Sequence, residues 1–113
     1  MTKNELKLKL TSKNYMDRVE VAEKGYALDT LINDEEWVVR MEVAKRGYGL
    51  DTLMNDKDWY VRAEVVRQGY GLDILINDED AYVRSEVARQ GFCLDKLQDD
   101  SHWLVRCEVA KHT

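Results

Sequence analysis

Residues 37–44 read Trp-Val-Val-Arg-Met-Glu-Val-Ala, and this stretch decides the fold because its pattern returns every 22 residues. The copies occupy residues 15–22, 37–44, 59–66, 81–88 and 103–110. The first copy is looser and has Asp17 where the later ones have valine. Units 37–58 and 59–80 are identical at 14 of 22 positions. Self-similarity at a fixed short period is typical of repeat architectures, in which each repeat is one supersecondary unit.

The signals within one unit predict a long helix followed by a short one. An aspartate stands where an N-cap belongs, and basic residues followed by glycine mark the C-terminal end. The predicted N-caps are Asp34, Asp56, Asp78 and Asp100, and the predicted terminating glycines are Gly47, Gly69 and Gly91. The long helices are therefore expected near residues 15–24, 35–46, 57–68, 79–90 and 101–112. Between them, stretches such as residues 50–54 have room for a short α- or 3₁₀-helix with one apolar face.

One unit has too little apolar surface to form a core alone, so neighbouring units must stack. We therefore predict an all-α protein, a right-handed α-solenoid of about four and a half 22-residue repeats. The repeats are residues 15–36, 37–58, 59–80 and 81–102, with a half-repeat at 103–113. Residues 1–14 align with the short-helix half of a unit and predict a degenerate N-terminal capping half-repeat. Their alternation of leucine and lysine is also strand-like, and the alternative is a basic arm that touches an acidic partner.

The composition fits one soluble domain of 113 residues, with 44% hydrophobic and 35% charged residues and no proline. No run of residues is apolar enough for a membrane span, and two cysteines are too few for a disulfide framework, so we expect a cytoplasmic protein. The net charge is −5, but residues 1–14 carry four lysines against one glutamate, which leaves −8 on residues 15–113. An acidic body makes nucleic-acid binding unexpected, because phosphate contacts require a basic surface.

A helical projection places Arg40 in the middle of the buried arc of its helix, beside Val39 and Val43. A buried guanidinium needs a carboxylate partner, because an unpaired buried charge is very costly. An aspartate lies six residues before this arginine in each of the later units, at Arg40, Arg62, Arg84 and Arg106. We therefore predict a ladder of Asp–Arg hydrogen bonds between layers. The functional alternative is an anion site made of stacked arginines.

The pattern Asp34-x4-Val39-Arg40-x2-Val43-Ala44 resembles the second helix of HEAT repeats. The short unit with its Leu-x2-Leu segment is similar to the leucine-rich repeat variant, whose units alternate an α-helix with a 3₁₀-helix. The likeness covers residues 15–113. It implies a superhelical fold and usually a protein-interaction role, although some HEAT-like relatives bind DNA or modify cofactor-carrying proteins. The chain departs from both families in having no proline, and it has no cysteine-rich segment of the kind that accompanies some variant-repeat proteins.

The outward face of the long helices is the candidate partner-binding surface. An apolar and aromatic stripe is predicted at Val38, Tyr60, Tyr82 and Leu104, continuing from Met16. An acidic stripe is predicted beside it at Glu42, Glu64 and Glu86, with Glu20 and Glu108 at its two ends. Aromatic side chains in a row are suited to anchor a protein partner. The alternative for the glutamates is ordinary surface pairing with the basic residue three positions later.

A second candidate surface is the edge formed by the last helix. We expect some of Trp103, Val105 and Val109 to be uncovered there and to stack against a second copy or another protein. The sequence has no Cys/His or Ser/His arrangement for a nucleophile and no phosphate-binding glycine loop, so we expect no catalysis, metal or cofactor. The predicted function is a non-catalytic scaffold for a protein partner. The alternatives are an accessory factor acting on nucleic acid or a cofactor-carrying protein, and a purely structural end-to-end assembly unit.

Overall fold

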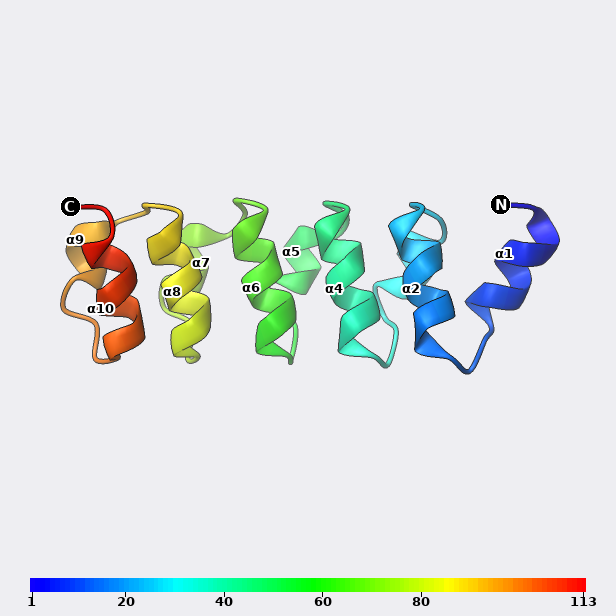
Figure 1. Cartoon of the computed structure of the whole chain (residues 1–113), viewed down its shortest axis with the longest axis horizontal. Coiled ribbons are helices and arrows are strands. Elements are labelled where there is room, and N and C mark those ends of the chain that lie inside the picture. The colour runs from blue at the N-terminus through cyan, green and yellow to red at the C-terminus, as the bar shows by residue number, and fades with distance from the viewer.

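The computed structural model describes all residues 1–113, and every regular element in it is a helix (Figure 1). The helices are α1 (Lys3–Leu10), α2 (Tyr15–Glu23), α3 (Leu28–Leu31), α4 (Trp37–Lys45), α5 (Leu50–Leu53), α6 (Trp59–Arg67), α7 (Leu72–Leu75), α8 (Ala81–Arg89), α9 (Leu94–Leu97) and α10 (Trp103–Ala110). The predicted all-α class is confirmed. The molecule is elongated, with extents of 53 × 21 × 18 Å.

The five long helices α2, α4, α6, α8 and α10 stand side by side in one row, and the short helices lie behind them (Figure 1). Each long helix packs on the next one along the chain, the short helices α3, α5 and α7 pack on the long helices before and after them, and α9 packs on α10. The chain therefore advances by one long helix per 22-residue unit. None of the helices has the length and apolar character needed to span a bilayer.

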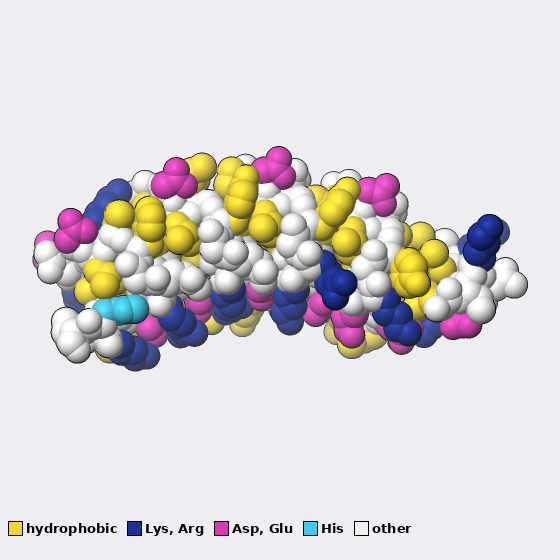
Figure 2. Space-filling model, turned by 90° about the horizontal axis from the view of Figure 1, so that it is seen from above, with side chains coloured by type: hydrophobic (Ala, Val, Ile, Leu, Met, Phe, Trp, Pro, Cys, Tyr) yellow, Lys and Arg dark blue, Asp and Glu magenta, His cyan; other side chains and the backbone are white.

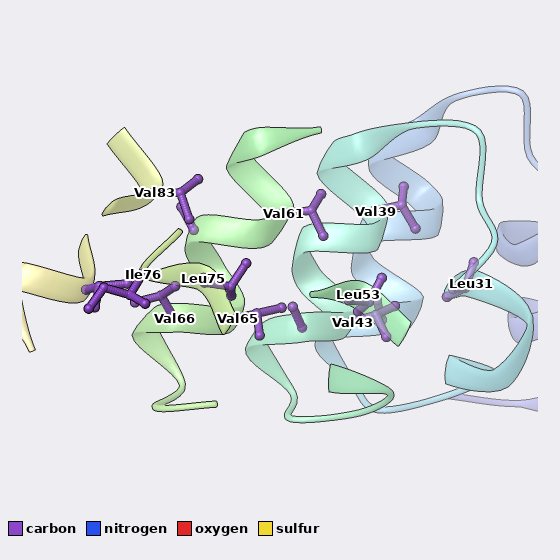
Figure 3. Close-up of a cluster of buried hydrophobic side chains, with 14 of the residues drawn as sticks. Leu31, Val39, Val43, Leu53, Val61, Val65, Val66, Leu75, Ile76 and Val83 are labelled. Atoms are coloured by element: carbon purple, nitrogen blue, oxygen red, sulfur yellow. The ribbon is translucent and has the colours of Figure 1, made fainter. Parts of the chain in front are cut away.

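The core is a continuous line of aliphatic side chains between the long and the short helices. Valines such as Val39, Val43 and Val61 come from the long helices, and leucines such as Leu31 and Leu53 come from the short ones (Figure 3). All of these side chains are buried. Because each layer contributes the same positions of its unit, the sequence period is also the period of the core.

Helix α2 begins at Tyr15 as predicted, but α4, α6, α8 and α10 begin about two residues later than the sequence signals indicated, so the predicted N-caps are wrong. Helix α6 begins after Asp58, whose carboxylate accepts a hydrogen bond from the Tyr60 N–H at 2.9 Å. The predicted cap Asp56 lies in the turn before it, where its Oδ1 accepts from the Asp58 N–H at 2.9 Å. Asp34, Asp78 and Asp100 make the same turn. These aspartates shape the entry to the helix while their carboxylates also bind the arginine of the preceding layer.

The C-terminal ends of the long helices follow the prediction. Gly47 has φ +75°, and its N–H donates to the Ala44 carbonyl at 2.8 Å. The N–H of Tyr48 reaches back to the Val43 carbonyl at 3.3 Å. This pair of bonds is the Schellman motif, in which a left-handed residue reverses the chain. The same pattern recurs at Gly25, Gly69 and Gly91.

The residue before each short helix is also left-handed, and two of these residues are not glycine. Gly49 and Gly71 adopt φ +63° and +71°, whereas Ala27 and Cys93 adopt +53° and +47°. A left-handed conformation costs a residue with a Cβ about 1–2 kcal/mol. The short helices therefore start at a strained residue wherever glycine is missing.

We expect Cys93→Gly to raise the free energy of unfolding by about 0.5–1 kcal/mol, because relief of the left-handed strain exceeds the entropy that glycine adds to the unfolded chain. Gly49→Ala should lower it, since the new Cβ would also collide with the Cδ1 methyl of Ile32. Urea unfolding followed by circular dichroism measures both. Equal and same-signed effects of the two substitutions would contradict this explanation.

Helix α1 shows that the alternating leucines of the N-terminal segment do not form a strand. Thr2 caps the helix by accepting from the Glu5 N–H at 3.1 Å. Leu6 and Leu10, four residues apart, lie on one helical face and pack on the core, while Leu8 is exposed. This helix covers the outer side of α2, which agrees with the predicted capping role of residues 1–14.

Candidate interaction surface

The contact that repeats between successive layers is an Asp–Arg ladder, which lies on the side where the long helices begin. Arg40 donates from Nε and Nη2 to the two carboxylate oxygens of Asp56 at 2.7 and 3.1 Å, and from Nη1 to the Asp34 carbonyl at 2.7 Å. The pairs of the ladder are Arg18–Asp34, Arg40–Asp56, Arg62–Asp78 and Arg84–Asp100. The predicted ladder is confirmed: Arg40, Arg62 and Arg84 each join the aspartates of two successive layers, whereas Arg18 joins Asp34 to the Ser12 carbonyl.

The guanidinium groups of the ladder arginines are paired within the protein and are therefore not free to bind a ligand. The hydrogen bond to Asp56 raises the pKa of Arg40 above its usual value, although burial acts in the opposite direction. At the far end of the ladder, burial disfavours the charged carboxyl of Asp100, but the hydrogen bonds from Arg84 and the His102 N–H outweigh it and lower its pKa. Arg106 has only the Asp100 carbonyl at 2.7 Å and is exposed.

Two open hollows lie beside the ladder, with volumes of about 610 and 340 Å³. Both are lined by Asn55, Asp56 and Lys57, in the turn before α6. The carboxylate of Asp56 at their shared wall is already bound by Arg40. The ladder side chains in the hollows are therefore already paired, whereas other polar lining residues such as Asn55 and Lys57 make no side-chain hydrogen bond.

The predicted apolar stripe is present and is wider than the sequence indicated. Tyr60 is 40% exposed and Tyr82 is half-buried, and both contact tryptophans of neighbouring positions. The ring of Tyr60 stacks on Trp37 at 4.8 Å and on Trp59 at 3.8 Å between centroids. Trp59 in turn meets Tyr82 edge-on at 4.9 Å. These four side chains form an aromatic cluster that crosses three layers.

The remaining predicted stripe residues lie on either side of the aromatic cluster. Val38 and Leu104 are half-buried, and Met16 is exposed. Trp37 and Trp59, the first residues of α4 and α6, also belong to this surface, although the predicted stripe did not include them. The signal that could have found them is their position at the first residue of each long helix, where the turn leaves one side of the ring open.

The predicted acidic stripe is wrong, because the glutamates are buried between the long helices. Glu86 is 1% exposed and Glu64 is 4% exposed, while Glu42 is half-buried. The long helices pack side by side, so these positions face the neighbouring helix rather than solvent. Small residues at Ala63 and Ser85, both buried, allow that close approach.

Each of these glutamates pairs with the basic residue three positions later, as the alternative interpretation predicted. The pairs are Glu42–Lys45, Glu64–Arg67, Glu86–Arg89 and Glu108–Lys111. Further ion pairs cross between layers, from Arg67 to Glu86 at 3.4 Å and from Arg89 to Glu108 at 3.3 Å. Hydrogen bonds from Lys111 and Arg89 lower the pKa of Glu108. The result is a chain of ion pairs that is continuous from Glu64 to Lys111, with Glu42–Lys45 as a separate pair.

Only the basic members of this chain reach the surface. Lys45, Arg67, Arg89 and Lys111, here called the basic row, have side chains that are 33–67% exposed. Every charged residue classed as exposed within α4, α6, α8 and α10 is basic. Figure 2 looks onto the end where the long helices terminate and shows basic side chains along one long edge, with a few acidic ones between them.

Arg67 connects the basic row to the aromatic cluster. Its Nη2 donates to the hydroxyl of Tyr82 at 2.8 Å, and its guanidinium carbon lies 5.8 Å from the centre of that ring. A cation at this distance from an aromatic face is attracted to it. Apolar and basic groups are thus adjacent on the long-helix face.

The predicted assembly edge is only partly uncovered. Trp103 is 63% exposed and stacks on His102 at 5.8 Å, and Val109 is half-buried. Val105 is fully buried, because α10 packs on both α8 and α9, so Trp103 is the member of the predicted edge that is uncovered. The edge offers one large exposed ring rather than an apolar surface.

No group of three or more His, Cys, Asp or Glu side chains is arranged to hold a metal ion, and Cys93 and Cys107 are free thiols. No family model, curated protein or solved structure matches this chain. The site must therefore be interpreted from its own geometry.

Proposed function

We propose that this chain is a right-handed α-solenoid that serves as a non-catalytic scaffold and binds a protein partner through the exposed face of its long helices. The resemblance of its units to HEAT and leucine-rich variant repeats supports a protein-interaction role. The observation that carries the proposal is the aromatic cluster of Trp37, Trp59, Tyr60 and Tyr82, with Tyr60 40% exposed.

Tyrosine and tryptophan dominate binding hot spots because they bury a large area and lose little side-chain entropy on binding. In this cluster the rings hold one another in place, since each stacks on a ring of the same or the adjacent layer. A surface that is already ordered keeps more of its contact energy as affinity.

The second candidate is a HEAT-like accessory factor that acts on nucleic acid or on a cofactor-carrying protein. The observation in its favour is the burial of Glu64 and Glu86, which leaves α6 and α8 without exposed carboxylates and with the exposed arginines of the basic row. The net charge of −8 on residues 15–113 opposes a long polyanion.

Affinity capture from the native cell tests the proposal with the variant Tyr60→Ala/Tyr82→Ala. We expect recovery of the partner to fall about tenfold or more, because loss of a hot-spot aromatic typically costs about 2 kcal/mol. The matched control is Tyr26→Ala/Tyr48→Ala, which removes two equally exposed tyrosines from the turns at the ends of α2 and α4. Unchanged recovery with the first variant, or an equal loss with the control, would place the partner elsewhere.

A further inference from the structure

We propose that the partner segment is an extended acidic peptide that lies along the row of long helices, with carboxylates on the basic row and apolar side chains on the aromatic cluster. This inference rests on the proposed function and adds the chemistry of the ligand. It follows from charge complementarity, from the spacing of the layers and from the contact between the two rows.

The two members of each ion pair in this row lie at different depths. The carboxylates of Glu64, Glu86 and Glu108 are 1–7% exposed, whereas Arg89 and Lys111 are 54% and 67% exposed. A ligand arriving at this face therefore meets the cations first. Arg89 already contacts two carboxylates at 3.3 Å and still presents about half of its side chain to solvent.

The two arginines of the basic row are paired with buried carboxylates through long contacts. Glu86 Oε2 has no hydrogen-bond donor, and its nearest cationic nitrogen is Arg67 Nε at 3.4 Å. The ion pairs of Arg67 and Arg89 measure 3.3–3.4 Å, in contrast with the 2.7 Å bonds of the ladder and the 2.9 Å bond from Lys111 to Glu108. An external carboxylate can share the Arg89 guanidinium without breaking a short hydrogen bond.

The distance between successive layers matches the rise of an extended peptide over three residues. Packed helices lie about 8–10 Å apart. An extended polyproline II chain rises about 3.1 Å per residue, so its every third residue advances about 9 Å. Glutamates at every third position would meet Lys45, Arg67, Arg89 and Lys111 in turn.

The two rows are close enough for one peptide to contact both. Tyr60 and Arg67 are seven residues apart in α6, which separates their Cα atoms by about 10 Å along the helix axis. The side chains close much of this distance, since Arg67 already reaches the hydroxyl of Tyr82 in the next layer at 2.8 Å. In a peptide with one acidic and one apolar residue in every three, each triplet would therefore span one layer, with the acidic residue on the basic row and the apolar residue on the aromatic cluster.

A short acidic peptide fits this surface better than a nucleic acid. The turns before the long helices expose Glu35, Glu79 and Asp99, and the body as a whole is acidic. A long polyanion would be repelled by that field, whereas a short peptide confined to the basic row would be much less affected.

Fluorescence anisotropy with a labelled peptide of four Glu-Leu-Pro triplets tests the proposal. We expect binding that weakens as salt is added. The variant Lys45→Gln/Lys111→Gln should weaken it about three- to tenfold, from two lost ion pairs of about 0.5 kcal/mol or more each. The matched control Lys57→Gln/Lys96→Gln removes two exposed lysines that lie off the long helices and should leave the affinity unchanged.

Three results would overturn the proposal: no binding of the peptide, equal binding of a peptide with lysine in place of glutamate, or equal weakening by the two lysine pairs. Tighter binding of a single-stranded oligonucleotide than of the peptide would also overturn it, in favour of a nucleic-acid ligand. If capture of the partner depends on Tyr60 and Tyr82 but the peptide does not bind, the interaction scaffold stands and the acidic-peptide chemistry fails.

Discussion

Arg62→Ala is expected to lower the free energy of unfolding by about 3–5 kcal/mol, because it removes one partner of a buried ion pair. Arg62 binds both carboxylate oxygens of Asp78 at 2.7 and 3.1 Å and the Asp56 carbonyl at 2.7 Å. The substitution leaves the Asp78 carboxylate buried with only the Asp80 N–H as a donor at 2.9 Å. Urea unfolding of the variant and the parent measures the difference.

The chain contains its own control for this substitution. Arg106 occupies the same position of its unit, but it is exposed and bonds only to the Asp100 carbonyl. Arg106→Ala should therefore change the free energy of unfolding by about 1 kcal/mol or less, since only one solvated hydrogen bond is lost. Similar losses for Arg62→Ala and Arg106→Ala would show that the inter-layer pair contributes little.

The features that were predicted correctly from the sequence are those whose signal lies within one 22-residue unit. The 22-residue period, the glycine stops at Gly47 and Gly69, and the Asp–Arg ladder each follow from local backbone geometry or from the need to pair a buried charge. A helical projection was sufficient for Arg40, because the valines beside it define the buried arc.

The features that were wrong depend on how close neighbouring units lie. A projection of one helix places Glu86 on the solvent side, but the adjacent helices cover that side and bury it. The small residues Ala63 and Ser85 were the available signal for close packing at this seam. The helix starts were placed two residues early because Asp34 and Asp56 resemble caps in sequence while they serve the ladder in space.

The position of the candidate surface was predicted correctly, but its tryptophan stacking and the sign of its exposed charge were not. Tyr60 lies on the exposed face as expected, and the stacking of Trp37 and Trp59 on it could not be read from one helix, because it joins adjacent layers. The sign of the exposed charge was reversed, since burial removes the carboxylates and leaves Arg67 and Arg89 outside.

Leu53→Ala is the second substitution with a large expected effect, about 2–5 kcal/mol of the free energy of unfolding. Leu53 is 1% exposed and belongs to α5, a helix of four residues that packs between α4 and α6. A helix this short has no stability of its own, so its place in the layer depends on the side chain that it buries. Loss of Leu53 therefore removes apolar burial and leaves a cavity between two long helices.

Thr52→Ala is the control in the same helix, because Thr52 is exposed. It should change stability by about 0.5 kcal/mol or less. Leu75→Ala, at the equivalent buried position of the next unit, should match Leu53→Ala to within about 1 kcal/mol, since each layer contacts only its neighbours. A loss confined to Leu53 would mean that the layers are not energetically equivalent, and that the sequence period does not extend to the stability of the row.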